Sequence, residues 1–216
     1  QRHKLRVQQV RRQKIFLTCL FLLIVGCILL RFSKFSGRQK ETHQLNAACE
    51  AYRDEVSSEA AQYDMSDYVD LILAVMMQES SGQGTDPMQS SEGAYNTRYP
   101  QQPNGITDPS YSISCGIQEL KYALEKAVCT GPTDLSKIRL ALQAYNFGAD
   151  SYFAYLEENG QTVWTAQSAQ AFAQMASGGT QRDEDDPLHD PAGPWDYGDQ
   201  YYPDHVLRYY HLDNNS

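Results

Sequence analysis

Residues 68–80, YVDLILAVMMQES, join a long apolar run to a polar end at Gln78, Glu79 and Ser80. At about 3.6 residues per turn, Ile72, Val75, Met76 and Glu79 fall on one helical stripe, so the face that enters the core also carries a carboxylic acid. Burial disfavours the charged form of a carboxyl, and the negative end of the helix dipole acts in the same direction. The stretch therefore predicts a helix that ends in an acid with a raised pKa, suited to protonate a leaving group.

Helical patterns continue on both sides of this stretch. Caps and apolar spacing predict helices that begin after Asn46, Ser66, Asp134 and Thr165, and a further helix that carries Ile117, Leu120 and Leu124. No alternating strand pattern is present, but residues 83–109 are rich in Gly, Pro, Asn and Ser, which predicts a long loop or a small hairpin. Residues 178–194, GGTQRDEDDPLHDPAGP, are interpreted as a mobile acidic insertion. We expect one mainly α domain.

The first forty residues contain ten Lys or Arg and no acid, around an uninterrupted apolar run from Ile15 to Leu30. This pattern predicts a transmembrane signal anchor over residues 15–32, a cytoplasmic basic tail over 1–14, a stalk over 33–46 and an exported domain over 47–212. A cleaved signal peptide and a lipoprotein modified at Cys27 are the two alternatives. The expected location is the cell membrane, crossed once, with the N-terminus in the cytoplasm and the folded domain outside.

The part after residue 40 holds eight basic residues against 27 acidic ones, a balance of −19. This charge argues against nucleic acid as a partner. Three cysteines lie in this part: Cys49, Cys115 and Cys129. The sequence is compatible either with one disulfide and one free thiol or with three free thiols. The scattered His residues and the absence of CxxC and HExxH patterns predict no metal site.

A cysteine peptidase is one alternative reading of the chain. Cys115 stands before the expected start of a helix, where a thiolate is stabilised, and His189, His205 and His211 follow later in the sequence. This hypothesis requires Cys115 to be accessible and its pKa to be lowered.

Three short motifs carry a resemblance to a known family: Glu79-Ser80, the segment CGIQEL at 115–120, and AYNFG at 144–148. In this order they resemble goose-type lysozymes and soluble lytic transglycosylases. The segments QESSGQGTDPMQSSEG, CGIQEL and YGDQYYPDHVLRYY are similar to segments of the lysozyme-like domain of the wall hydrolases of conjugative transposons. The resemblance covers about Cys49 to Tyr210 and implies an α+β lysozyme-like fold.

The resemblance also implies roles for individual residues. Glu79 would be the general acid that protonates the glycosidic oxygen between N-acetylmuramic acid and N-acetylglucosamine, with Ser80 orienting it. Gln118 would shape the cleft floor, although the glycine of this motif stands one place later than in the family. Tyr145 would lie near the acid and Asn146 would pin the local backbone.

The second catalytic group decides the reaction. An inverting hydrolase needs a carboxylate base about 6.5 to 9.5 Å from the acid. Asp86 is the first choice, followed by Glu92 and Asp108. Lytic transglycosylases lack such a base and form 1,6-anhydro ends, which makes transglycosylation the first alternative.

The sequence as a whole therefore predicts a membrane-tethered muramidase that needs no cofactor and opens the cell wall locally. A non-catalytic wall-binding scaffold module is the alternative from a different functional class. The expected partners are peptidoglycan strands, the membrane, and a conjugation or secretion apparatus. Related proteins commonly continue into a cysteine-peptidase domain, so any peptide-cleaving activity is expected in another protein or beyond residue 216.

Overall fold

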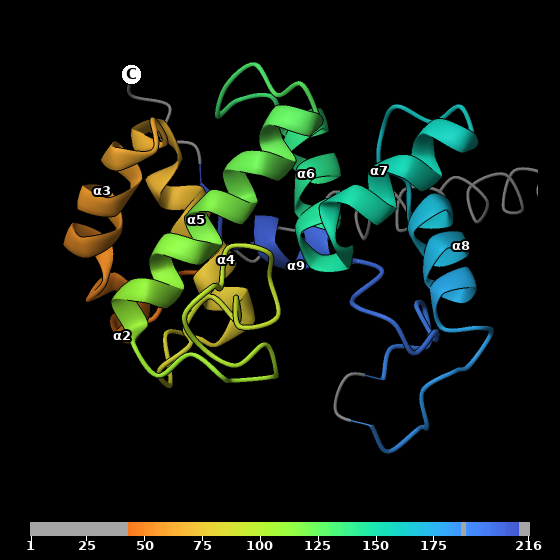
Figure 1. The fold of residues 1–216 in the computed structure, drawn as a ribbon. Coiled ribbons are helices and arrows are strands. Elements are labelled where there is room, and N and C mark those ends of the chain that lie inside the picture. Colours follow the sequence, from red (N-terminus) through yellow and green to blue (C-terminus); the bar gives the residue numbers. More distant parts are fainter. Residues whose placement is uncertain (1–42, 187–188, 212–216) are drawn as a thin grey trace, which may run out of the picture. The chain divides into compact units, whose positions relative to one another are not determined.

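Helix α4 (Val69–Glu79) lies in the middle of the core, with neighbouring helices packed around it (Figure 1). The structure is a computed structural model that describes residues 43–186 and 189–211. Six consecutive side chains of α4, from Leu71 to Met76, are fully buried. The helix is therefore enclosed on all sides, which a helix with one apolar stripe would not be. A 3₁₀ turn, η1 (Ser66–Tyr68), precedes α4, and no side-chain capping bond forms at its start.

The segment before α4 forms two helices where the sequence predicted one. Asn46 caps α2 (Ala47–Glu50) by accepting a 2.8 Å hydrogen bond from the backbone N–H of Cys49. The chain then turns at residues 51–52 and continues as α3 (Arg53–Gln62). Val56 and Ala60 of α3 are buried, and α3 packs against α4 and α5.

The two longest helices lie next to each other in the fold. Helix α5 (Pro109–Lys126) begins with proline in its first turn, and Asp108 caps it by accepting from the N–H of Ser110. Helix α6 (Leu135–Phe147) begins after Asp134 and ends at Gly148, as predicted. Helix α6 packs against α5, α7 and α9, so it links the first half of the domain to the second.

Three further helices complete the domain: α7 (Ala149–Glu158), α8 (Ala166–Ala176) and α9 (Tyr202–Leu207). Only α8 was predicted, and Thr165 opens it with a capping box. The side chains of Phe147, Tyr152, Phe172 and Tyr197 pack ring against ring, with centroids 5.2 to 5.8 Å apart. This cluster fixes the segment before α9 against α6, α7 and α8.

The described residues contain no β-strand, so the mainly helical prediction is confirmed and the α+β character implied by the resemblance is not seen. Residues 83–108 form the long loop that was one of the two predictions for this stretch, and not the hairpin. A single bridge joins Gln181 to Trp195. Around it, Arg182 donates to the carbonyl of Pro194 and Asp196 donates to that of Thr180, both at 2.9 Å. Within its described part, the acidic segment 178–194 is therefore tied back upon itself.

The predicted basic tail and membrane anchor, the Cys27 alternative and the stalk up to residue 42 lie outside the described residues. None of the helices that the structure describes has the length and apolar character needed to cross a membrane.

Candidate active site

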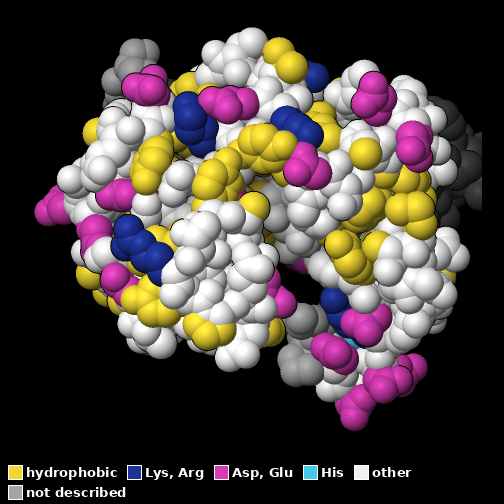
Figure 2. All heavy atoms as spheres, viewed as in Figure 1, with side chains coloured by type: hydrophobic (Ala, Val, Ile, Leu, Met, Phe, Trp, Pro, Cys, Tyr) yellow, Lys and Arg dark blue, Asp and Glu magenta, His cyan; other side chains and the backbone are white. Residues whose placement is uncertain are grey.

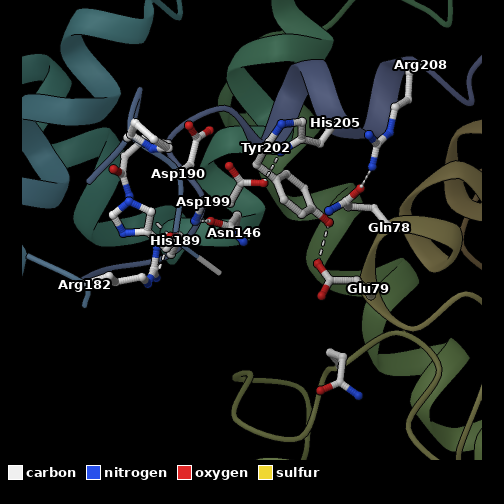
Figure 3. A pocket seen from close by; sticks show the side chains of 15 residues that line it. Gln78, Glu79, Asn146, Arg182, His189, Asp190, Asp199, Tyr202, His205 and Arg208 are labelled. Atoms are coloured by element: carbon white, nitrogen blue, oxygen red, sulfur yellow. Dashed lines mark hydrogen bonds and ion pairs between the residues drawn. The ribbon is translucent and has the colours of Figure 1, made fainter. Parts of the chain in front are cut away.

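A cleft of about 720 Å³ opens where the C-terminal ends of α4 and α6 meet α9 and the acidic segment 178–194. Figure 2 shows a hollow in this face, with acidic side chains gathered over the segment beside it. The side chains that line the cleft include Glu79, Asn146, Arg182, Asp199, His205 and Arg208, and Figure 3 shows how they lie. The segment interpreted from sequence as a mobile insertion therefore contributes one wall of the cleft.

Glu79 is the last residue of α4 and is only partly exposed, at the edge of the cleft. Burial raises the pKa of its carboxyl to about 7, and the negative charges of Asp199 and Asp86 add to this rise. The phenol of Tyr202 donates a 2.5 Å hydrogen bond to Oε1 of Glu79, which acts in the opposite direction. Because Oε1 accepts this bond, Oε2 is the atom left to carry a proton into the cleft.

Tyr202 belongs to a pair of phenol rings beneath this acid. It is almost completely buried and stacks on Tyr145, with ring centroids 6.3 Å apart and planes at 21°. Tyr145 donates a 3.0 Å hydrogen bond to the carbonyl of Met88. Burial raises the pKa of both phenols well above the ordinary value, so both stay protonated and act as donors. The structure thus brings Tyr145 close to Glu79 through Tyr202.

Asn146 lines the cleft and holds the opposite wall in place. Its Oδ1 accepts a 2.7 Å hydrogen bond from the backbone N–H of Asp199, and Gln143 donates to the carbonyl of Asp199 at 2.8 Å. Gly198 makes this approach possible: its φ is +47°, and a Cβ there would lie 2.6 Å from Oδ1 of Asn146. The AYNFG motif therefore fixes a carboxylate that lies more than fifty residues later in the chain.

Asp199 and His205 form a hydrogen-bonded pair at the cleft surface. Nδ1 of His205 lies 2.5 Å from Oδ2 of Asp199, and this hydrogen bond raises the pKa of the imidazole. Oδ1 of Asp199 accepts from the N–H of Tyr201 at 2.8 Å. The side chain of Asp199 is 28% exposed, so this carboxylate is accessible from the cleft.

Ser80 connects the acid-bearing end of α4 to the loop that follows. Its hydroxyl donates a 2.8 Å hydrogen bond to the carbonyl of Pro87 and accepts from the N–H of Gly82 at 3.1 Å. The side chain lies behind Glu79 and does not line the cleft. Its contacts hold the position of the helix end.

Asp86 does not line the cleft and is only 1% exposed. Its two oxygens accept four hydrogen bonds: from the N–H groups of Ser90 (3.0 Å) and Ser91 (3.2 Å), and from the hydroxyls of Ser91 (2.5 Å) and Ser112 (2.6 Å). This carboxylate therefore organises the loop after α4 and joins it to α5. Its charge still reaches Glu79, as the raised pKa of that carboxyl shows.

The other two candidate bases do not line the cleft either. Asp108 is the cap of α5, with its Oδ1 accepting from the N–H groups of Ser110 and Tyr111 at 3.2 and 3.5 Å. Glu92 is exposed on the loop that follows Asp86. Neither is placed beside Glu79.

Gln118 is not brought to the cleft. Its amide donates to the backbone carbonyl of Ser114 at 3.1 Å, on the preceding turn of α5. The glycine of the same motif has the closer link to the site: a Cβ on Gly116 would lie 2.6 Å from Cβ of Met88, whose carbonyl holds Tyr145. Gly116 thus lets the loop after α4 pack directly on α5.

The cysteines offer no peptidase site in the described chain. Cys115 is fully buried in the middle of α5, not before a helix start, and burial raises the pKa of its thiol. An activated nucleophile needs the opposite environment. Cys49, Cys115 and Cys129 are all free thiols. Across residues 43–186 and 189–211, no three His, Cys, Asp or Glu side chains are arranged to hold a metal ion.

Glu119 is a second carboxyl with a raised pKa near this site. Burial raises the pKa to about 7, and the charges of Asp86 and Glu79 add to the rise. Its Oε1 is buried without a hydrogen-bond partner, in the space that a side chain at Gly93 would need. Two carboxyls in this part of the fold are therefore partly protonated at neutral pH.

Sequence reasoning missed the contribution of residues 197–210. Tyr202, Asp199 and Arg208 were not singled out, and His205 was considered only as a partner for Cys115. The signal was available in YGDQYYPDHVLRYY, which is part of the family resemblance. A short helix with no regular apolar stripe did not show how these side chains face the acid.

A family model described as Lysozyme-like matches residues 47–210. The chain is 34% identical over 169 residues to the bifunctional muramidase/DL-endopeptidase CwlT of Bacillus subtilis, covering 78% of this chain and 44% of that protein. It is 40% identical over 115 residues to the uncharacterized membrane protein YocA of Bacillus subtilis, covering 51% of this chain and 45% of that protein. The chain thus spans less than half the length of these two relatives.

Among solved structures, a Staphylococcus aureus protein described as similar to a lipoprotein of the NLP/P60 family matches with a TM-score of 0.66 and 27% identity. The match covers 81% of this chain and 56% of that one. The family model extends over nearly all of the described residues and includes every residue of the candidate site. The chain belongs to the lysozyme-like family.

Proposed function

We propose that this chain is a peptidoglycan N-acetylmuramidase that cleaves the β-1,4 bond between N-acetylmuramic acid and N-acetylglucosamine, with Glu79 as the general acid. The observation that carries the proposal is the pKa of about 7 of a carboxyl that borders a 720 Å³ cleft. The muramidase activity in the name of the CwlT relative supports it.

In the proposed reaction the glycan lies in the cleft with its scissile oxygen at Oε2 of Glu79. The Tyr202 phenol holds Oε1 and stabilises the carboxylate that remains after proton transfer, because a hydrogen bond to a charged acceptor is stronger than one to a neutral acceptor. The stacked Tyr145 ring and the Ser80 contacts keep this geometry fixed.

For the second carboxylate we propose a division of roles. Asp86 is required for activity, but it acts by its charge on Glu79 and by its four hydrogen bonds to the loop and to α5, because it is 1% exposed and does not line the cleft. Asp199, 28% exposed and on the cleft wall, is assigned the base that activates water. Transglycosylation, which needs no such base, is the alternative.

Mass spectrometry of fragments released from purified peptidoglycan by the full chain tests the function. Reducing N-acetylmuramic ends are expected from the native chain, and none from Glu79→Gln, while the exposed acid Glu92 provides the control Glu92→Gln. Release of fragments with 1,6-anhydro ends would indicate transglycosylation instead of hydrolysis. Wall binding without release by a folded chain would refute catalysis and favour a scaffold module.

We propose further that residues 15–32 anchor the chain in the cell membrane with the domain facing the wall. The basic and apolar pattern of the sequence supports this, as does the word membrane in the name of the YocA relative. A conjugation or secretion apparatus as partner is supported by the family resemblance alone. Protease protection of the N-terminal tail in intact cells, with the domain digested, is the expected result.

A further inference from the structure

Helix α9 and its C-terminal cap residue present three polar side chains to the cleft at intervals of three residues. Tyr202 bonds Glu79, His205 bonds Asp199, and Arg208 donates a 3.0 Å hydrogen bond to Oε1 of Gln78 (Figure 3). Positions i, i+3 and i+6 lie close to one face of a helix, so the three groups form a continuous row. Gln78, Glu79 and Arg208 all line the same cleft, so the guanidinium end of this row opens to the space that the proposed acid borders.

Arg208 differs from most other cations of the domain in having no acidic partner. Of the eight Lys and Arg side chains after residue 40, five form ion pairs with carboxylates. Arg98 lies over a tyrosine ring and Lys137 bonds a backbone carbonyl, both away from the cleft. Arg208 is exposed, lies 4.9 Å over the ring of Tyr209, and makes no ion pair with any residue of 43–186 or 189–211.

Although Asp190 and Asp199 also line the cleft, the guanidinium of Arg208 is available to bind an anion there. Glu79 has a pKa raised to about 7, so it is only partly ionised at neutral pH, and His205 carries a proton more readily than an isolated imidazole. Arg182, on the other wall, is bound to Asp196 at 3.5 Å and has an 8% exposed side chain. The available cation in this acidic domain is therefore Arg208, and a guanidinium binds a carboxylate through two parallel N–H donors.

We propose that Arg208, with His205 beside it, binds a carboxylate of the substrate's N-acetylmuramic acid residue and so selects muramyl glycans over neutral N-acetylglucosamine polymers. The proposal rests on the proposed function and defines its substrate more narrowly. N-acetylmuramic acid differs from N-acetylglucosamine by a lactyl ether that ends in a carboxyl. That carboxyl is free in bare glycan strands, and in peptidoglycan it is amide-linked to a stem peptide that carries its own carboxylates.

Three preparations of the same glycan strands separate these two sources of a carboxylate. The first retains its stem peptides, the second has been stripped of them and bears free lactyl carboxylates, and the third is the stripped strand converted to the neutral methylamide. The native full chain is expected to cleave at least one anionic preparation about tenfold faster, in kcat/KM, than the methylamide, which is the effect of one charge-assisted hydrogen-bonded contact.

Arg208→Gln is expected to abolish this preference by lowering cleavage of the anionic strand to the rate on the methylamide. Arg139→Gln is the matched control, because Arg139 also contacts α9, through Asp204, but does not line the cleft. This control should retain the preference. Faster cleavage of stripped strands identifies the lactyl carboxylate as the bound group, whereas faster cleavage of intact strands alone identifies the stem peptide.

Equal cleavage of all three preparations by the native chain, or an undiminished preference in Arg208→Gln, would overturn the proposal while leaving the muramidase function intact. Release of no fragments from any preparation would instead refute the proposed function. In that case, calorimetric titration of the native chain with the stripped and the methylamide strands tests whether Arg208 binds a carboxylate. Equal affinities for the two strands would refute carboxylate binding.

Discussion

Replacing Tyr202 by Phe removes one hydrogen bond from the proposed acid and leaves the buried ring in place. The phenol donates to Oε1 of Glu79 at 2.5 Å, and this bond lowers the pKa of Glu79 against the larger effect of burial. A hydrogen bond to a charged group contributes about 1.5 to 3 kcal/mol, and one between neutral groups about 0.5 to 1.5 kcal/mol. The bond therefore favours the ionised acid by about 1 kcal/mol, or slightly less than about one pH unit.

A general acid works only while protonated, so activity is lost as pH rises through its pKa. For the native chain, kcat/KM is expected to fall above about pH 7. In Tyr202→Phe the alkaline limb of the plot of kcat/KM against pH should move to higher pH by about 0.7 units. The rate on the acidic side of this limb should fall a few-fold, because Glu79 loses the contact that orients it.

The assay is release of soluble fragments from purified peptidoglycan at a series of pH values, with circular dichroism to verify folding. Tyr155→Phe is the control, because Tyr155 packs on Phe172 in the aromatic cluster and belongs to a different part of the domain. A limb that moves downward, or that stays in place in a folded Tyr202→Phe chain, would show that Tyr202 does not set the ionisation of Glu79.

Three further changes test other parts of the site. Asp199→Asn removes the proposed base and a negative charge that raises the pKa of Glu79, so we expect a rate loss of about 100-fold or more and a residual alkaline limb at lower pH. Asp86→Asn places an amide N–H among four donors and should lower the free energy of unfolding by about 2 to 4 kcal/mol, measured by urea denaturation, together with activity. Gly116→Ala forces a methyl group against Met88 and should cost about 1 to 3 kcal/mol in the same measurement.

Each of these changes has a result that contradicts its reasoning. An Asp199→Asn chain with native rates on peptidoglycan would remove Asp199 from the reaction. Glu92→Gln, an exposed change near Asp86, should stay within about 0.5 kcal/mol of the native stability, and an Asp86→Asn loss no larger than this would show that the buried network contributes little. A Gly116→Ala chain with native stability would mean that Met88 repacks freely.

The sequence predicted the helices whose signals are local. Asp134 and Thr165 cap the helices that they were expected to open, and Gly148 ends one of them. The spacing around Glu79 likewise predicted an apolar helix ending in an acid, and α4 has that form. Helix α9 was missed because its six residues provide one and a half turns, too few for an apolar period to be recognised.

Sequence predicted the positions of only those site residues that lie on a helix with a recognisable local pattern. Glu79 is placed by α4, and Tyr145 and Asn146 by the end of α6. Asp86 and Asp199 could not be distinguished from sequence, because burial of a loop carboxylate depends on serines that are up to 26 positions away in the chain. The exposure of Asp199 depends in turn on its contact with Asn146, which is 53 positions away.

The hydrogen bond between Tyr202 and Glu79 joins residues that are 123 positions apart. Closing such a long loop is entropically costly and comes late relative to local helix formation. A chain that is still being synthesised therefore carries Glu79 well before the phenol of Tyr202 can reach it. The proposed cleavage by such a chain would begin only after α9 has docked, so the order of folding would delay the proposed activity until the domain is complete.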